Sequence, residues 1–361
     1  MKIVILAAGV GRRLWPVSNS NMPKQFQPLI SEKPLIRMKF DYLLKGFSAK
    51  NIFISTDVKF VLHAKKIFPE LPEENFIGIP GEKDNGPTAL FSILKIKEMF
   101  PNEIVALQWS DHYIGNPTAF VNVLKQARDI VKKEEKVVMV GLPVKNIPTT
   151  KGHINIGSKI LDLPNGNTLY EFVKHIEELP TGDTAKLYLE SGSYLKNPGF
   201  IVTPMDIIID KFKANAPDIY NAINQIKEAG FSKESFHYFE EMPRGNFSKV
   251  FTEKLNPNEA LIIKSDVDWK DIGSWDSVFS TLQKASGESV KMGNVYELDS
   301  NNNLIFNYDS NKLVVLMSMN KEQFAIINTK EVLAIFPLKE TGKLKELTNN
   351  FEIDKKYSKY L

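Results

Sequence analysis

Short apolar runs alternate with longer segments of helical spacing over the first 142 residues. Runs such as Ile3–Leu6 and Val137–Leu142 have the length of one buried strand, whereas apolar residues recur near helical spacing between Pro34 and Phe47. Buried strands are predicted at residues 3–6, 51–56, 76–80, 103–108 and 137–142, and helices at 34–47, 58–68, 90–100 and 120–134. This alternation favours a parallel sheet with right-handed crossovers, in which ligands bind beyond the carboxyl ends of the strands.

The pattern changes twice after residue 142. The regular alternation stops, and a long helical segment follows from Met205 to Ala229, with a break at Pro217-Asp218. From about Ala285 onward, polar turns separate short β-like segments at residues 293–298, 303–306, 313–317, 323–328 and 332–336, and a lysine-rich helix is predicted from 341 to 360. We therefore predict a large α/β domain over residues 1–285 and a small C-terminal β domain with a terminal helix over residues 286–361.

Composition and charge narrow the class of protein. The chain has 361 residues, of which 43% are hydrophobic and 25% charged, as in an ordinary globular protein with a sizeable core. A net charge of +3 is too small to imply a nucleic-acid or membrane-surface partner, and the absence of cysteine excludes disulfides and thiolate chemistry. No apolar run approaches the roughly 18 residues of a spanning helix, and no basic segment precedes the first strand, so we expect a cytoplasmic protein.

The first predicted strand runs into a loop of small residues. Two alanines and two glycines occupy this loop over residues 7–11, and the cations Arg13 and Lys24 follow it. Backbone N–H groups of a glycine loop can converge on one small space, which together with two cations suits a polyphosphate. The ATPase P-loop is excluded because Arg12 follows Gly11, and the dinucleotide fingerprint is excluded because residue 14 is leucine. A plain strand–helix turn remains the alternative interpretation.

A carboxylate follows the strand predicted over residues 103–108. Asp111 lies in the sequence Trp109-Ser110-Asp111-His112, at the tip of a central parallel strand. One aspartate in this place is chemically sufficient to hold Mg²⁺ together with phosphate oxygens of a substrate. An aspartate that caps the following turn is the alternative. His112 fits a supporting or structural role better than the role of a catalytic base.

The opening segment resembles the signature of the sugar-1-phosphate nucleotidylyltransferases, and within them the mannose-1-phosphate guanylyltransferases. The matching residues are Gly9, Gly11, Arg13, Leu14, Trp15, Pro16, Pro23, Lys24, Gln25 and Phe26. Further matches cover Ser110–His112, the segment from Thr184 to Phe200, and the block from Trp269 to Trp275. The resemblance therefore extends over nearly the whole chain, although the last block read alone is also compatible with a tryptophan-anchored strand, turn and helix.

The resemblance implies a set of site residues. It assigns nucleotide binding to Leu6, Ala7, Ala8, Gly9, Gly11, Arg12, Arg13, Lys83, Asn85, Gly86 and Pro87. It assigns catalysis to Arg13, Lys24 and Asp111, and binding of Mg²⁺ to Asp111 and Asp271. It assigns binding of the sugar phosphate to Gly152, Lys174, Asn197 and Gly199. From the residues alone, Asn197 could instead bond its own turn, and the 83–87 segment could be an ordinary helix entry.

The chain departs from the family pattern in several places. Ala8 replaces a glycine, Arg12 a threonine and Trp109 a proline, and the family's base-binding residues are altered at 83–85. The largest departure lies at 174–176, where lysine, histidine and isoleucine replace the family's Glu-Lys-Pro. Either Lys174 binds the phosphate from a shifted register, or recognition of the sugar has changed.

The expected fold is α/β: a Rossmann-like nucleotidyltransferase domain with a mixed but mostly parallel sheet, and a small C-terminal β domain resembling a short β-helix that supports a homodimer. The expected function is transfer of a guanylyl group from GTP to a hexose 1-phosphate, first of all mannose 1-phosphate, which yields GDP-mannose and pyrophosphate with Mg²⁺ as cofactor. Two alternatives stay open: a different nucleotide or sugar 1-phosphate, and a catalytically silent homologue that binds a nucleotide sugar as a regulatory subunit.

Overall fold

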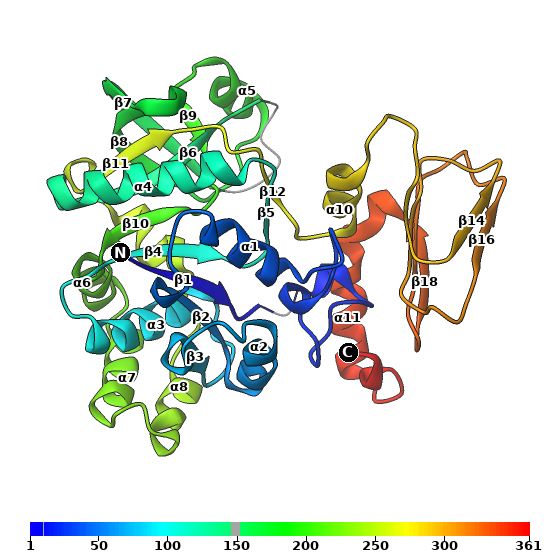
Figure 1. Ribbon diagram of the computed structural model, residues 1–361, viewed down its shortest axis with the longest axis horizontal. Helices are drawn as coiled ribbons and strands as arrows, with labels where there is room; N and C mark the ends of the chain where they lie inside the picture. Colours follow the sequence, from blue (N-terminus) through cyan, green and yellow to red (C-terminus); the bar gives the residue numbers. More distant parts are fainter. Residues whose placement is uncertain (10, 146–151) are drawn as a thin grey trace. The chain divides into compact units, whose positions relative to one another are not determined.

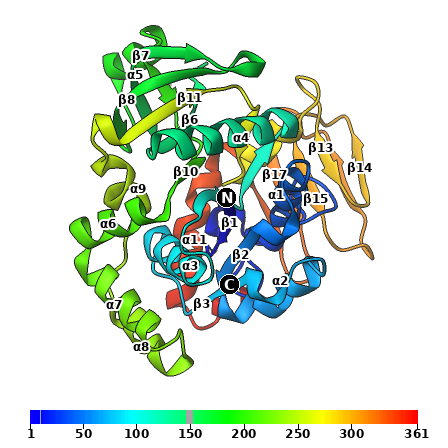
Figure 2. The same ribbon diagram turned by 60° about the vertical axis from the view of Figure 1, so that its left-hand side comes forward.

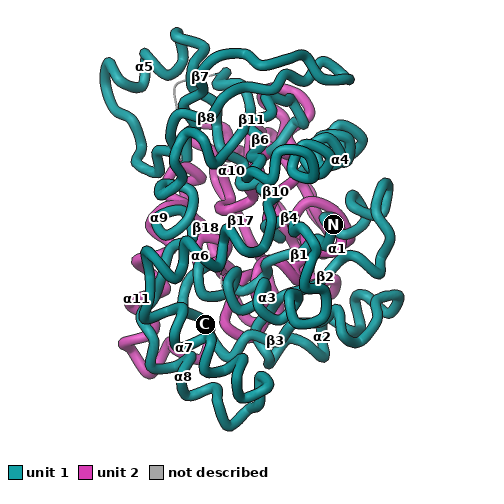
Figure 3. Tube along the Cα trace, turned by 90° about the vertical axis from the view of Figure 1, so that its left-hand side faces the viewer, with its two compact units in different colours: residues 1–8, 39–110, 114–269 teal, residues 9–38, 111–113, 270–361 magenta. Residues whose placement is uncertain are grey.

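The computed structural model of the protein describes residues 1–9, 11–145 and 152–361 (Figure 1). The chain forms two compact units, each built from segments that are distant in the sequence (Figure 3). Unit 1 contains residues 1–8, 39–110 and 114–269, and unit 2 contains residues 9–38, 111–113 and 270–361. The glycine loop and both predicted carboxylate ligands therefore belong to the same unit as the C-terminal strands. The predicted domain boundary at residue 285 stays a prediction.

One half of the sheet in unit 1 has the predicted parallel arrangement. Its neighbouring strands are, in order, β3 (Phe76–Ile79), β2 (Ile52–Asp57), β1 (Lys2–Ala7) and β4 (Ile104–Trp109). All three pairings among them are parallel. Every residue of β1 is buried, which explains the continuous apolar run of its sequence after Lys2.

The prediction of a mostly parallel sheet is wrong. Among the pairings of the described strands in this sheet, six of ten are antiparallel. The other half holds β6 (Val137–Pro143), β7 (His153–Asp162), β8 (Thr168–Ile176), β9 (Tyr194–Lys196), β10 (Ile201–Pro204) and β11 (Ala260–Lys264). Only five residues join β7 to β8, whereas a parallel crossover needs a dozen or more.

The predicted helices are present with shifted ends, as α1 (Leu35–Leu44), α2 (Val61–Ile67), α3 (Asn85–Met99), α4 (Pro117–Glu134), α6 (Met205–Asn215) and α7 (Pro217–Glu228). Sequence reasoning missed α5 (Gly182–Glu190), α8 (His237–Glu241) and α9 (Phe247–Val250). Because α3 begins at Asn85, Gly86-Pro87 lies in its first turn, where proline costs no helical hydrogen bond. Figures 1 and 2 show α4 lying beside β6 and β10.

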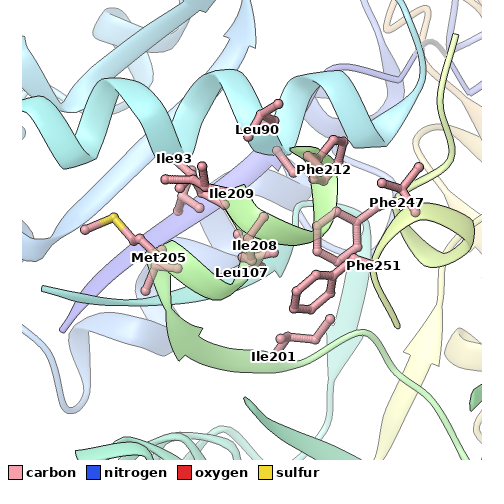
Figure 4. Packing of buried hydrophobic residues seen from close by; sticks show 14 of the residues in the cluster. Leu90, Ile93, Leu107, Ile201, Met205, Ile208, Ile209, Phe212, Phe247 and Phe251 are labelled. Carbon is pink, nitrogen blue, oxygen red and sulfur yellow. The ribbon is translucent and has the colours of Figure 1, made fainter. Parts of the chain in front are cut away.

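The core of unit 1 lies between helices and the central strands. Leu90 and Ile93 of α3 and Ile208 and Phe212 of α6 join one buried cluster with Leu107 of β4 (Figure 4). Burial of side chains of this size contributes about 1.5–3 kcal/mol each. These helices pack with β4, which ends at Trp109, two residues before Asp111 in the sequence.

Unit 2 combines the residues after the glycine loop with the C-terminal segment. Trp275 is fully buried, and its Nε1 donates to the carbonyl oxygen of Trp15 at 2.9 Å. Its ring meets Phe306 edge-on, with 5.7 Å between the ring centroids. This cluster includes residues of α10 (Trp275–Leu282) and of α11 (Leu344–Ile353). The predicted terminal helix is therefore shorter than expected, since α11 ends at Ile353.

The C-terminal strands form stacked parallel pairs. One sheet contains β13 (Val290–Met292), β15 (Leu304–Asn307), β17 (Phe324–Asn328) and β18 (Leu333–Pro337), and a second contains β14 (Val295–Leu298) and β16 (Val314–Met317). The pairs β13–β15, β15–β17 and β14–β16 are parallel. Asn328 donates through Nδ2 to Oδ1 of Asn307 at 2.7 Å, which links successive layers inside the stack. A separate two-stranded sheet pairs β5 (His112–Ile114) with β12 (Trp269–Asp271).

Across the described residues, none of the helices is both long enough and apolar enough to cross a lipid bilayer.

Candidate active site

The glycine loop follows β1 directly and supports the side chain of Lys24. Gly11 has φ = +75°, a conformation that favours glycine, and a short 3-10 helix follows it from Arg12 to Leu14. A Cβ placed on Gly11 would lie 2.6 Å from Cδ of Lys24. The missing side chain therefore serves two purposes, because it permits the backbone turn and leaves room for the lysine stem.

Lys24 and Asp111 form a close ion pair in unit 2. The Lys24 Nζ lies 2.6 Å from Oδ2 of Asp111, with side chains 12% and 25% exposed respectively. His112 lies on the other side, with Nε2 3.7 Å from Oδ1 of Asp111. Burial acts to raise the pKa of Asp111, but Lys24 and His112 together outweigh it and hold that pKa below its usual value. Asp111 is therefore a carboxylate at neutral pH.

A second carboxylate completes an acidic cluster beside this pair. One ligand atom from each of Asp111, His112 and Asp271 lies within 4.8 Å of the others. The backbone accounts for this proximity, because the N–H of Ile272 donates to the carbonyl oxygen of Asp111 at 3.1 Å. An octahedral ion about 2.1 Å from each of two carboxylate oxygens holds them about 3 Å apart as neighbours and about 4 Å apart when opposite. Two carboxylates at this distance, which leave room for phosphate oxygens, are a donor set that fits Mg²⁺.

Arg13 approaches the same cluster from the loop. A Cβ added to Gly273 would lie 3.0 Å from Nη2 of Arg13 and 3.3 Å from Oδ2 of Asp271. Both charged groups therefore border the same backbone position, which only a glycine leaves open. Unit 2 thus brings together the guanidinium, the ammonium and two carboxylates that the sequence predicted for catalysis and for the metal.

Arg12 is directed elsewhere. Its guanidinium forms an ion pair with Glu352 of α11, and its Nη1 also donates to Oδ1 of Asn349 at 2.6 Å. The structure therefore separates two adjacent arginines, with Arg13 beside Asp271 and Arg12 on the C-terminal helix.

The other residues predicted to bind the nucleotide lie in unit 1, apart from Gly9. Leu6 and Ala7 end β1, and Ala8 follows. At the start of α3, Asn85 accepts the backbone N–H of Phe247 through Oδ1 at 2.7 Å, and Lys83 donates through Nζ to the carbonyl oxygen of Glu240. A Cβ on Gly86 would lie 2.6 Å from the carbonyl oxygen of Gly245. A Cβ on Gly245 would in turn lie 3.5 Å from Cδ of Pro87. In this segment, close backbone packing accounts for the small residue.

The predicted sugar residues are only partly brought together. The backbone N–H of Asn197 donates to the carbonyl oxygen of Gly152 at 2.7 Å, and its side-chain Oδ1 accepts the N–H of Gly199 at 2.8 Å. Asn197 therefore does bond its own turn. Gly199 has φ = +78°, and a Cβ there would lie 2.2 Å from Nε1 of Trp109, so the chain passes directly over this indole. Residues 149–151 of the neighbouring predicted motif lie outside the described residues.

Lys174 does not join this group, because β8 contains a bulge. Asn155 pairs with Lys174 and the next residue, Ile156, pairs with Phe172, which leaves Val173 as the extra residue. Lys174 is exposed as a result, whereas the side chain of His175 is fully buried. A shifted register in which Lys174 meets the sugar phosphate receives no support from this geometry.

Sequence reasoning missed the residues that surround Asn197 in place of Lys174. His175 contacts Nδ2 of Asn197 through Nε2 and Oγ1 of Thr252 through Nδ1, each at 3.0 Å. Glu177 lies 3.8 Å from Nε2 of His175. The available signal was the departure from the family pattern at residue 175, but the bulge that decides which side chain faces inward depends on pairing with β7.

Comparisons with known proteins agree with the fold and the signature. The family model described as "Nucleotidyl transferase" matches residues 2–287. A protein named mannose-1-phosphate guanylyltransferase 2 from Escherichia coli O157:H7 is 25% identical over 98% of this chain and 74% of its own length. The alginate biosynthesis protein AlgA of Pseudomonas aeruginosa is 25% identical over 92% of this chain and 68% of its own. A solved structure from Thermus thermophilus, described as a mannose-1-phosphate geranyltransferase, superposes with a TM-score of 0.82 at 18% identity and covers 97% of this chain and 99% of that one.

Proposed function

Because the chain belongs to the nucleotidyl transferase family, we propose that it transfers a guanylyl group from GTP to a hexose 1-phosphate, with mannose 1-phosphate as the first candidate. The products are a GDP-sugar and pyrophosphate. The observation that carries the proposal is the Lys24–Asp111 pair beside Asp271 in unit 2. The names of two relatives at 25% and 26% identity, both mannose-1-phosphate guanylyltransferases, support guanylyl transfer and mannose 1-phosphate.

The proposed reaction is an in-line displacement at the α-phosphorus. A phosphate oxygen of the sugar 1-phosphate forms the new bond to this phosphorus, the bond to the bridging oxygen of the β-phosphate breaks, and pyrophosphate leaves with the electron pair. Such a reaction depends on positioning and on stabilisation of charge more than on a covalent nucleophile. Backbone N–H groups at Gly9 and Gly11 orient the triphosphate. Arg13 and Lys24 stabilise the charge that develops on the leaving group.

Asp111 and Asp271 are the residues proposed to hold Mg²⁺. When bound, the ion would neutralise phosphate charge. Lys24 already compensates one oxygen of Asp111 at 2.6 Å, so this carboxylate stays ionised and ready to bind a cation. His112 supports its other oxygen from 3.7 Å.

A second candidate is the same chemistry with a different sugar 1-phosphate. It is favoured by the exposed Lys174 and the buried His175, which occupy positions where the resembling family carries glutamate and lysine. In this case the residues of unit 2 keep their roles, and the change is confined to the surroundings of Asn197.

Release of pyrophosphate tests both candidates. The purified protein is incubated with Mg²⁺, each of the four ribonucleoside triphosphates, and either mannose 1-phosphate or glucose 1-phosphate. We expect release with GTP and mannose 1-phosphate. Release with another pair alone would retain the mechanism and reassign the substrate. Saturable binding of GDP-mannose without release from any pair would contradict the enzyme proposal in favour of a silent, regulatory homologue.

A further inference from the structure

His175 lies at the centre of a chain of hydrogen bonds in unit 1. Its Nε2 is 3.0 Å from Nδ2 of Asn197, and its Nδ1 is 3.0 Å from Oγ1 of Thr252. The Thr252 hydroxyl also lies 3.3 Å from the carbonyl oxygen of Ser248. The imidazole therefore connects the turn that holds Asn197 to the segment around residue 250, and none of its side chain is exposed.

The positions of the protons in this chain follow from one fixed donor. The backbone N–H of Gly199 can only donate, so the Asn197 atom 2.8 Å from it is the carboxamide oxygen. The other carboxamide atom is then the amide nitrogen, which donates to Nε2 of His175. Nδ1 of His175 must therefore carry the ring proton and donate to Thr252, whose own hydroxyl proton goes to Ser248. Each donor has one acceptor, and the imidazole is neutral.

The charges around His175 agree with a neutral ring. Burial, with a smaller contribution from the nearby His153, lowers the pKa of His175 to about 4. Oε2 of Glu177 lies 3.8 Å from Nε2 and would favour a cation, but burial outweighs it and the pKa of His175 stays low. No protonated imidazole is needed to satisfy any bond in the chain.

We propose that His175 is a positioning residue that, as a neutral imidazole with its proton on Nδ1, holds the Asn197 carboxamide so that the second Nδ2 hydrogen donates to a hydroxyl group of the hexose. Selection of the sugar at this position then depends on neutral hydrogen bonds and not on a cation that binds its phosphate. The inference rests on the proposed function, because the family resemblance behind that function is also what assigns Asn197 to the sugar phosphate.

The state of the ring can be measured without any substrate. Long-range ¹⁵N–¹H NMR of the ligand-free protein distinguishes the two neutral tautomers and the cation, and the spectrum of His175→Gln assigns the signal. We expect the Nδ1–H tautomer from pH 8 down to about pH 5. A proton on Nε2, or a cationic ring at neutral pH, would overturn the inference.

Substitutions at residue 175 test the positioning role. Glutamine can accept from Asn197 and donate to Thr252, so His175→Gln should keep the KM for the sugar phosphate within about threefold. Lysine has three donors and no acceptor, so His175→Lys should leave the Asn197 amide unpaired and raise this KM about tenfold, with kcat and the KM for GTP nearly unchanged. Leu187→Lys, at an exposed position of α5, controls for gain of a cation elsewhere in unit 1.

The outcomes separate this inference from the proposed function. If His175→Lys binds the sugar phosphate more tightly than wild type, the site requires a cation and the inference is wrong, although the enzyme assignment stands. If no pair of substrates reacts, the proposed function fails, while the NMR measurement still decides the tautomer. If the glutamine and lysine variants have equal KM values for the sugar phosphate, the hydrogen-bond chain does not position Asn197.

Discussion

The cluster around Asp111 in unit 2 and the cluster around Asn197 in unit 1 satisfy buried polar groups in opposite ways. The first pairs Lys24 with Asp111 beside a second carboxylate, so its members are ions that remain partly exposed. The second connects Asn197, His175 and Thr252 through neutral groups. Charge that develops during phosphoryl transfer demands ionic residues at fixed places, whereas neutral hydrogen bonds to a sugar can be met by different side chains. The chain matches the family signature in the first cluster, whereas in the second it keeps Asn197 and departs at His175.

The largest effect is expected from Arg13. Arg13→Ala removes a fixed cation beside Asp271 and should lower kcat about 10²–10³-fold, by analogy with loss of one preorganised donor at a developing charge. The kcat of the variant is measured by steady-state kinetics, with the pair of substrates that the pyrophosphate assay identifies. Full turnover by the variant would remove Arg13 from the proposed mechanism.

The second prediction tests whether Asp111 is a ligand of the metal ion. Asp111→Asn removes one carboxylate of the cluster and leaves Lys24 without its 2.6 Å partner, so we expect loss of activity and a higher Mg²⁺ requirement. Titration of activity with Mg²⁺ and calorimetry of Mn²⁺ binding provide two readouts. Identical titrations for variant and wild type would show that Asp111 is not a ligand.

Gly11 connects the loop backbone to Lys24. Gly11→Ala places a Cβ 2.6 Å from Cδ of Lys24 at a left-handed backbone position, which alone costs about 1–2 kcal/mol. We expect a lower unfolding midpoint and about tenfold lower kcat, because the ammonium must move. Gly9→Ala is the matched control for stability, since its Cβ would meet nothing within 4 Å. Equal midpoints for the two variants would contradict this role of Gly11.

The neutral cluster predicts a pH dependence of stability. Burial lowers the pKa of His175 to about 4 in the folded protein, against about 6.5 when unfolded, so protons bind the unfolded state more readily. The free energy of unfolding should therefore fall as pH drops from about 6.5 to 4, by roughly 3 kcal/mol from this residue. Urea unfolding at several pH values measures it. His175→Gln should reduce the slope, whereas His237→Gln, at an exposed position, should retain it.

The smallest effect is expected from Arg12. Its pair with Glu352 is exposed, at 38% and 49% for the two side chains, and such pairs contribute about 0–1 kcal/mol. Arg12→Thr and Glu352→Gln should each change kcat less than about threefold, in contrast to Arg13→Ala. A loss comparable to that of Arg13→Ala, seen for Arg12→Thr and absent for Glu352→Gln, would instead place Arg12 on the nucleotide.

Sequence reasoning was accurate where a local signal determines the structure. The apolar run of β1, the parallel strands beside it and the family blocks that contain Asp111 and Asp271 could be predicted directly. In the structure, a carboxylate oxygen of Asp111 lies within 4.8 Å of one of Asp271. The antiparallel half of the sheet could not be predicted, because β10 pairs on both sides with strands that are distant in the chain, β4 and β6. The inward orientation of His175 depends in the same way on a bulge against β7.

The composition of unit 2 from three separate segments has a consequence for biosynthesis. Lys24, Asp111 and Asp271 lie on different segments, and about 250 residues separate the first from the last. At 5–20 residues per second, a ribosome needs roughly 10–50 s to add Asp271 after Lys24. During that time the strands of the parallel half are completed, but Lys24 and Asp111 still lack the second carboxylate, that of Asp271. A nascent chain therefore acquires its acidic cluster only when its last quarter emerges.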